Sequence, residues 1–169
     1  MLPSVKDTNE RRLEASTRSD FVPIIEGEIR KTKAPAFRLH VVGDFYSEEY
    51  IRKWIEIATD LERVIFFGST RTWRCGFMGE VMKDLRDMPN VFMKASTDGT
   101  DDLDPTIVGW RIWSIDGAGD PCPHDYSIVE DCNNCGRCWK QRDTDTSFRL
   151  RWGKQEDYLA LVMSKSKEN

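Results

Sequence analysis

The alternation of strand-like and helix-like segments between residues 37 and 97 is the feature that most limits how this chain can fold. Apolar residues at helical spacing predict a helix that begins after Ser47 and a second helix over residues 77–85. The predicted strands before, between and after these helices cover residues 37–42, 63–67 and 90–95. This order is typical of parallel βαβ units, whose crossovers are nearly always right-handed. We therefore predict an α/β fold, either a partial barrel or an open parallel sheet of about four strands, with the fourth over 107–115.

The chain is expected to have three regions. Residues 1–20 are polar and charge-rich, which indicates a loose arm or a frayed helix. Residues 21–116 form the predicted βα core, which begins with a helix over 21–32. Residues 117–169 form a small cysteine-rich lobe and a C-terminal element, where aromatic and arginine residues alternate over 148–152 and a short apolar run covers 158–163. Because residues 116–146 contain few long apolar runs, something other than a hydrophobic core must hold them together.

Four cysteines in this lobe have the spacing of a metal site, namely Cys122-x9-Cys132-x2-Cys135-x2-Cys138. Three thiolates on one tight turn can each reach a different iron atom, and bacterial ferredoxins use the same C-x2-C-x2-C core. We therefore predict an iron–sulfur cluster, with [4Fe–4S] as the expected type. Zinc is the alternative, since four thiolates also provide a tetrahedral zinc site, and an unmetallated or disulfide-bonded state also stays open. The metal would have either a structural role or a redox or catalytic one.

Two further residues could take part in metal binding, but each has a simpler interpretation. His124 lies two residues after Cys122 and is either an ordinary loop histidine or a residue that lines or ligates the site. Cys75 stands apart from the other four cysteines and is expected to be a packed or loop thiol.

Polar residues at the predicted strand ends form a second candidate site. Ligands of parallel α/β folds bind at the carboxyl ends of the strands, so we predict a ligand-binding rim there. Its residues are Asp44, Thr70, Arg71 and Asp98. The simpler reading is that they are caps and turns, and Asp44 or Asp98 is expected to pair with Arg38 or Arg71. His40 is expected to share a strand face with Arg38 and Val42.

Composition restricts the classes of partner. The net charge of -4 argues against a protein that coats nucleic acid by charge alone. Arginines interleaved with aromatics between residues 137 and 154 suggest either a binding surface for single-stranded nucleic acid or a half-buried strand. No stretch is long and apolar enough for a membrane span, and the charged N-terminus does not resemble a signal peptide. We therefore expect a cytoplasmic protein that does not enter membranes.

Several motifs together resemble the phage "gene product eighty-eight" family. They are the runs 37–50 (FRLHVVGDFYSEEY) and 50–58 (YIRKWIEIA), the strand end 69–71 (STR), and the Cys-x2-Cys-x2-Cys-Trp motif at 132–139. The resemblance covers roughly residues 35–140. It implies a radical-SAM-like α/β scaffold, with residues 43–45 and 70–71 at the mouth of the barrel.

One departure from the family bears on the expected activity. The resemblance implies that longer members carry an N-terminal cysteine motif for a catalytic cluster, whereas no cysteine precedes Cys75 here. We therefore expect a shortened, phage-encoded iron–sulfur protein of the host cytoplasm, with a binding or electron-carrying role rather than radical catalysis. One alternative is a zinc-stabilised module that binds nucleic acid or inhibits a host protein. Another is an enzyme that acts on nucleotides through the strand-end rim.

Overall fold

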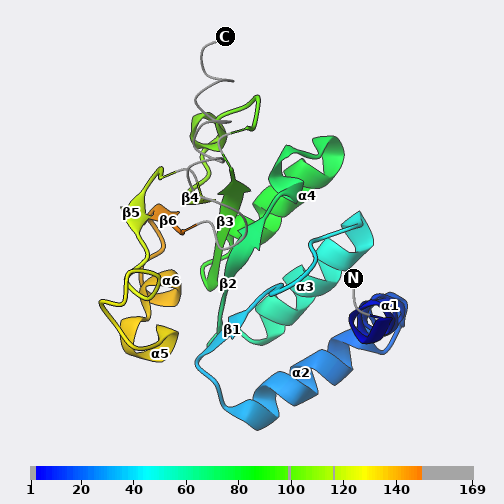
Figure 1. Cartoon of the computed structure of the whole chain (residues 1–169). Coiled ribbons are helices and arrows are strands. Elements are labelled where there is room, and N and C mark those ends of the chain that lie inside the picture. The colour runs from blue at the N-terminus through cyan, green and yellow to red at the C-terminus, as the bar shows by residue number, and fades with distance from the viewer. Residues whose placement is uncertain (1–2, 99, 116, 150–169) are drawn as a thin grey trace.

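The computed structural model describes residues 3–98, 100–115 and 117–149, which form a mixed α/β fold (Figure 1). The helices are α1 (Pro3–Thr17), α2 (Phe21–Thr32), α3 (Glu48–Asp60), η1 (Thr72–Arg74), α4 (Gly76–Asp87), η2 (Pro105–Val108), α5 (Cys132–Cys135) and α6 (Arg137–Lys140). The strands are β1 (Ala36–Arg38), β2 (Ile65–Thr70), β3 (Val91–Thr97), β4 (Ile112–Ser114), β5 (Asp120–Pro121) and β6 (Thr146–Ser147).

All six strands belong to one parallel sheet with the order β1-β2-β3-β4-β6-β5. The predicted α/β class and parallel sheet are therefore confirmed. The sheet has two more strands than predicted, because the cysteine-rich region contributes β5 and β6. Backbone hydrogen bonds from these two short strands help to hold a region that has little apolar core of its own.

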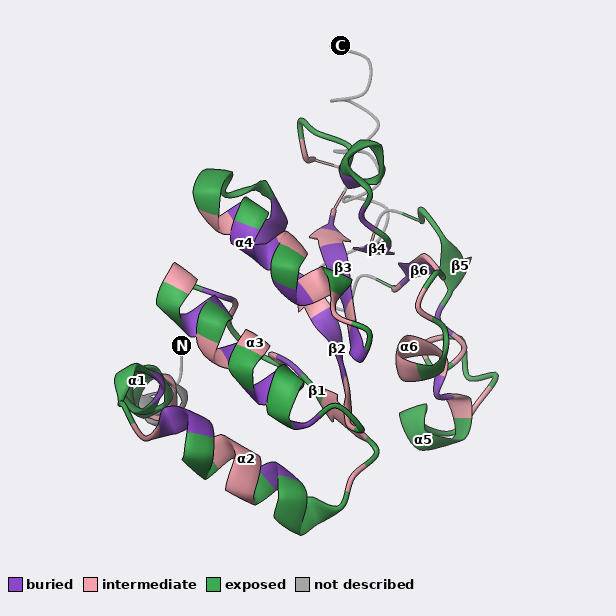
Figure 2. Ribbon diagram, turned by 180° about the vertical axis from the view of Figure 1, so that it is seen from behind, coloured by how far each residue is buried: buried purple, intermediate pink, exposed green. Residues whose placement is uncertain are grey.

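The two faces of the sheet have different coverings. Residues paired in register point to the same side, and the pairs Arg38–Phe67, Ser69–Lys94 and Ser96–Trp113 define what we call the inner face. The opposite face carries the buried side chains of Phe66 and Met93, which belong to the main hydrophobic core. Helices α2, α3 and α4 lie on that side, whereas α5 and α6 lie on the inner side (Figures 1 and 2).

Helix α3 illustrates how local sequence determines the core. The Ser47 side chain caps the helix by accepting a hydrogen bond from the backbone N of Tyr50 at 3.2 Å. Tyr50, Trp54 and Ile57 recur at helical spacing and are buried. The Trp54 ring lies 6.3 Å from that of Phe66, which joins α3 to the sheet.

The N-terminal segment is the helix α1 rather than a loose arm. Its last turn is fixed by side chains from the α3 region, where Ser16 Oγ and Tyr46 Oη are 2.6 Å apart. Lys53 Nζ donates to the backbone O of Ser16 at 3.0 Å. These contacts stabilise the end of α1 against the core.

The first strand is shorter than predicted, because the chain turns after Arg38. Leu39 is buried with 1% of its surface exposed, and His40 has a φ of 51°, in the left-handed region that a strand excludes. His40 and Val42 therefore lie beyond the strand, and the prediction that they share a strand face with Arg38 is wrong.

The fourth and last predicted strands also differ from the structure. Strand β4 covers Ile112–Ser114 alone, since Asp104 caps the 3-10 helix η2 through a 2.8 Å bond from Thr106 N. Phe148 and Arg149 follow β6 without being part of a strand, and residues 150–152 of that prediction lie outside the described residues. The apolar run predicted at 158–163 also lies outside them.

Candidate metal centre

Three of the four cysteines lie on two consecutive one-turn helices. The side chain of Asp131 caps α5 by accepting from Asn134 N at 2.8 Å. Gly136, with a φ of 66°, ends α5 and starts α6, and its N–H donates to Cys132 O at 2.7 Å. The tight turn gathers these three thiols within seven residues of chain, as the C-x2-C-x2-C spacing requires.

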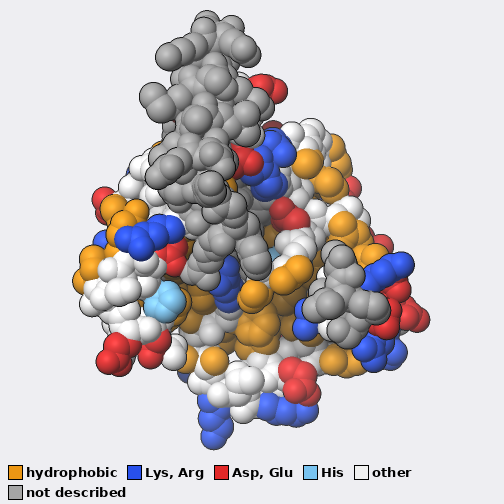
Figure 3. Space-filling view, in the orientation of Figure 1, with side chains coloured by type: hydrophobic (Ala, Val, Ile, Leu, Met, Phe, Trp, Pro, Cys, Tyr) orange, Lys and Arg blue, Asp and Glu red, His pale blue; other side chains and the backbone are white. Residues whose placement is uncertain are grey.

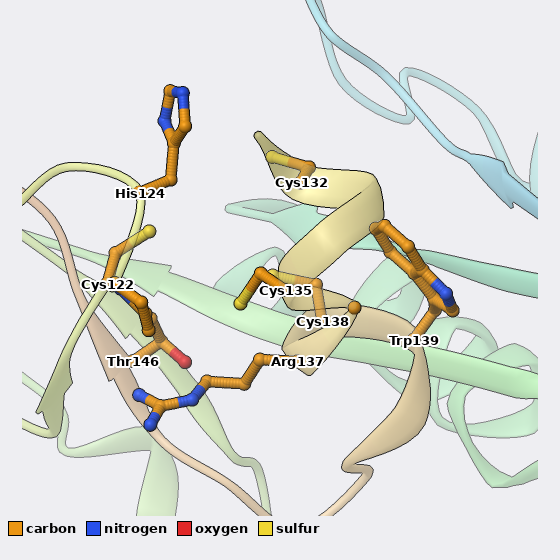
Figure 4. Close-up of a pocket in the computed structure, with 10 residues that line it drawn as sticks. Cys122, His124, Cys132, Cys135, Arg137, Cys138, Trp139 and Thr146 are labelled. Carbon is orange, nitrogen blue, oxygen red and sulfur yellow. The ribbon is translucent and has the colours of Figure 1, made fainter. Parts of the chain in front are cut away.

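The fourth cysteine comes from the other side of the lobe. Cys122 follows β5, and its N–H donates to Ser147 O at 2.8 Å in continuation of the strand pairing. Cys122 is buried, with 9% of its surface exposed. Figure 4 shows the loop that carries Cys122 and His124 facing the two short helices that carry the other three cysteines.

All four thiols line one small cavity of about 20 Å³, and all four are free cysteines. His124 also lines this cavity, whereas Cys75 is an exposed thiol outside it. Among the residues that the structure describes, no group of three or more His, Cys, Asp or Glu side chains already has the arrangement of a metal site. The structure therefore brings the predicted sulfur ligands to one place, and the metal itself stays a prediction.

The thiols disfavour one another's ionisation. Burial, followed by negative charge on Cys122, Cys132 and Cys135, raises the pKa of Cys138 to about 11. Burial and the neighbouring thiols also raise the pKa of Cys132, while Arg38 acts in the opposite direction. Sulfur ligands must lose their protons to bind a metal, so a cation in this cavity would replace protons rather than enter beside them. Four soft sulfur donors fit iron–sulfur clusters and zinc.

A buried lysine of the inner face forms hydrogen bonds with the cysteine-bearing segment, which we define as residues 122–148. Lys94 in β3 is 1% exposed, and its Nζ donates to Thr144 O at 2.8 Å and to Arg142 O. Burial lowers the pKa of Lys94 to about 8, although the carboxylates of Asp145 and Asp143 oppose the shift. Lys94 is not among the predicted site residues. The signal was a lysine between the apolar residues Met93 and Ala95 of a predicted strand.

The predicted rim residues do meet at the strand ends, where they bind one another. Asp44 Oδ1 accepts from Thr70 Oγ1 at 2.5 Å, and Asp44 Oδ2 accepts from the backbone N of Arg71 at 2.6 Å. The Arg71 guanidinium forms ion pairs with Asp98 at 3.0 Å and with Asp101 at 2.8 Å. The predicted pairing of Asp98 with Arg71 is therefore confirmed. These bonds occupy much of the polar surface that a ligand would use, and the role of the rim in binding stays a prediction.

The charge of Asp98 is stabilised by this network. Burial acts to raise its pKa, but hydrogen bonds from Thr100 and Arg71 outweigh burial and lower the pKa below its ordinary value. Arg74 adds a further ion pair to Asp101. The rim is therefore a set of compensated charges, which is what a structural tie between strand ends requires.

A second, larger cavity adjoins the thiols and was not predicted. Its volume is about 470 Å³, and it lies between the inner face and the cysteine-bearing segment. Arg38, Ser69 and Ser96 line it from three neighbouring strands. A sign of this cavity was present in the sequence, because the polar residues Lys94 and Ser96 lie two positions apart near the end of β3 and therefore share one face of the sheet.

The fold and the site define an α/β protein with a parallel sheet and a four-cysteine segment on one face of it. The family model described as Gene product 88 matches residues 1–141. The chain therefore belongs to the Gene product 88 family of phage proteins, as the motifs predicted. No curated protein and no solved structure matches it.

The prediction that the protein does not enter membranes has one structural test. In the described part of the chain, none of the helices combines the length and the hydrophobicity that crossing a membrane demands.

Proposed function

We propose that this member of the Gene product 88 family is an iron–sulfur protein with a [4Fe–4S] cluster. The ligands would be Cys122, Cys132, Cys135 and Cys138. The observation that carries the proposal is that all four thiols line one small cavity, although Cys122 comes from a separate loop. A radical-SAM-like origin of the scaffold is part of the same proposal.

The spacing and geometry favour iron over zinc. Zinc sites commonly use two separated pairs of ligands, each on its own turn. Here three thiols lie within seven residues on two consecutive one-turn helices, and a single thiol approaches from the opposite wall (Figure 4). This three-plus-one arrangement is the one expected when each thiolate binds a different corner of a cluster.

The surroundings favour a structural or electron-carrying role. A cluster with four thiolates is negatively charged, and both Arg38 and Lys94 lie close enough to interact electrostatically with the thiols. The cluster would also link two segments that lie ten residues apart in the sequence, and the lobe has little apolar core to join them otherwise.

Metal and sulfide analysis of protein purified without air tests the proposal. We expect ~4 iron and ~4 sulfide per chain, as a [4Fe–4S] cluster requires, together with a brown colour that bleaches on reduction or in air. Cys135→Ser should lower the iron content strongly. Cys75→Ser is the matched control, because Cys75 is an exposed cysteine outside the cavity, and it should leave the iron content unchanged.

Two results would contradict the proposal that the four cysteines hold an iron–sulfur cluster. A colourless protein that holds ~1 zinc per chain would overturn the cluster and support the zinc-stabilised interaction module instead. Equal iron loss in Cys75→Ser and Cys135→Ser would show that the iron is not bound by the four predicted ligands.

A further inference from the structure

The 470 Å³ cavity beside the cysteines has the size and the wall chemistry of a small-molecule site. Ligand pockets typically span about 300–1,000 Å³. The floor is the inner face of the sheet, and the opposite wall belongs to the cysteine-bearing segment. Figure 3 shows apolar side chains gathered in the middle of this side of the molecule, with Lys or Arg side chains among them.

The walls of the cavity are rich in aromatic rings. Phe67 from β2 and Trp113 from β4 lie on the sheet side, with Trp139 from α6 and Phe148 after β6 completing the walls. Phe67 and Trp139 are in contact at 5.1 Å between ring centroids, and Trp113 and Phe148 at 5.3 Å. Two pairs of rings suit a flat aromatic ligand, which stacks on such rings at about 1–3 kcal/mol per base in nucleic-acid complexes.

Two guanidinium groups add positive charge at the same cavity. Arg38 lies over the Trp113 ring at 5.6 Å and Arg149 over the Tyr126 ring at 4.1 Å. Neither arginine has an ion-pair partner among the residues that the structure describes. A stacked arginine keeps the N–H groups at its edge free for an anion, and its fork matches the oxygens of a phosphate.

Polar groups of other kinds complete the lining. The hydroxyl-bearing residues Ser69 and Ser96 lie near the carboxyl ends of β2 and β3, where parallel α/β folds bind their ligands. Asp125 is a carboxylate in the lining, and its Oδ2 accepts a bond from Arg149 N at 3.2 Å. The indole Nε1 of Trp113 is buried and has no hydrogen-bond partner among the described residues.

We propose that this cavity binds a nucleoside monophosphate, with the base between the aromatic rings and the phosphate on Arg38 and Arg149. The base accounts for the four rings, the phosphate for the two arginines, and the ribose hydroxyls for the serines. The site is distinct from the predicted rim, whose polar groups bind one another. It adjoins the thiols, since Cys122, Cys132 and Cys138 also line the cavity.

Calorimetric titration of the 169-residue protein, purified without air so that any bound metal is kept, tests this site. The probes are AMP, GMP, CMP and UMP, with adenosine and inorganic phosphate as partial ligands. We expect at least one monophosphate to bind, and adenosine and phosphate to bind at least about tenfold more weakly, since each lacks half of the contacts. Affinity should fall as salt is raised, because the phosphate contacts are ionic.

Variants connect the binding to the cavity. Arg38→Met should weaken the monophosphate at least about tenfold, and Arg149→Met gives a second, independent test if the first variant does not fold. Arg63→Met is the matched control, because Arg63 is an exposed arginine outside the cavity lining. It should bind as tightly as the unaltered protein.

Three results would overturn the proposal: no binding of any monophosphate at about 1 mM, phosphate binding as tightly as the monophosphates, or unchanged affinity in both arginine variants. The metal analysis is a separate measurement. A protein that lacks iron but binds a monophosphate through Arg38 would support this site and overturn the cluster. A protein that holds the iron–sulfur cluster but binds no monophosphate would support the cluster and overturn this site.

Discussion

Replacing Lys94 by methionine separates two opposing effects on stability. Methionine has nearly the same length but no charge, so the change removes a buried cation and keeps most of the packing. It also removes the donor that binds the backbone O atoms of Thr144 and Arg142. The first effect stabilises the folded protein, and the second destabilises it.

The structure gives the size of both effects. Burial lowers the pKa of Lys94 from 10.5 to about 8. Because one pKa unit corresponds to about 1.4 kcal/mol, holding this charge in the folded state costs about 3 kcal/mol below pH 8. Losing the donor to two carbonyls costs about 1 kcal/mol each. Near pH 7 the two effects nearly cancel, and Lys94→Met should change the free energy of unfolding by no more than about 1 kcal/mol.

The effect of Lys94→Met on the free energy of unfolding should depend on pH, which a change in packing alone would not produce. Between pH 8 and 10.5 the unfolded chain holds its proton on Lys94 more tightly than the folded protein does, so the contribution of Lys94 to stability rises with pH. By pH 10.5 the variant should be the less stable protein by about 2 kcal/mol. At that pH the unaltered protein no longer holds a buried charge on Lys94, whereas the variant still lacks the two hydrogen bonds.

Urea unfolding of metal-free protein, measured for both proteins from pH 7 to 10.5, checks the prediction. The raised pKa of Cys138 makes stability fall above pH 9, where the unfolded thiol ionises first, but burial is the largest cause of that shift and is common to both proteins. The difference between the two curves therefore reports Lys94. A difference that stays constant over the whole pH range would refute the reasoning.

Three further substitutions test the core and the rim by urea unfolding. Asn90→Ala should cost about 2–3 kcal/mol, because its Nδ2 donates to three backbone carbonyls that close α3 onto the sheet, the nearest at 2.9 Å. Gly68→Ala should cost about 2 kcal/mol, since its Cβ would lie 2.6 Å from the backbone O of Leu39; a neutral result would mean that the chain after β1 can move aside. Asp44→Ala should lower the free energy of unfolding by about 2 kcal/mol and leave the iron content unchanged. Loss of as much iron as in Cys135→Ser would mean that the rim supports the cysteines.

The elements that the sequence predicted are those with local signals. Ser47 begins α3 as its capping position indicated, and the apolar spacing of residues 77–85 falls within α4. The C-x2-C-x2-C spacing predicted that three thiols would share a turn, since such a short segment has few other ways to arrange them. Each of these signals depends on residues within one or two turns of each other.

The features that were missed depend on residues far apart in the chain. Strands β5 and β6 have two residues each, too few for any alternation to be visible, and they exist because each pairs with a distant strand. Strand β1 ends early because the backbone turns at His40, although Phe37, Val41 and Val42 have high strand propensity. Arg38 lies on the inner face because its register in β1 pairs it with Phe67.

The inner face connects the two proposed sites. In β2, Phe67 packs on Trp139 and Ser69 two residues later lines the larger cavity. In β3, Lys94 binds the segment that follows α6, and Ser96 two residues later lines the same cavity. Phe67 and Lys94 therefore hold the cysteine-bearing segment, while Ser69 and Ser96, together with Phe67 itself, form the cavity floor. Because this segment is also the opposite wall, anything that loosens it, including loss of the metal, should weaken nucleotide binding without changing a single floor residue.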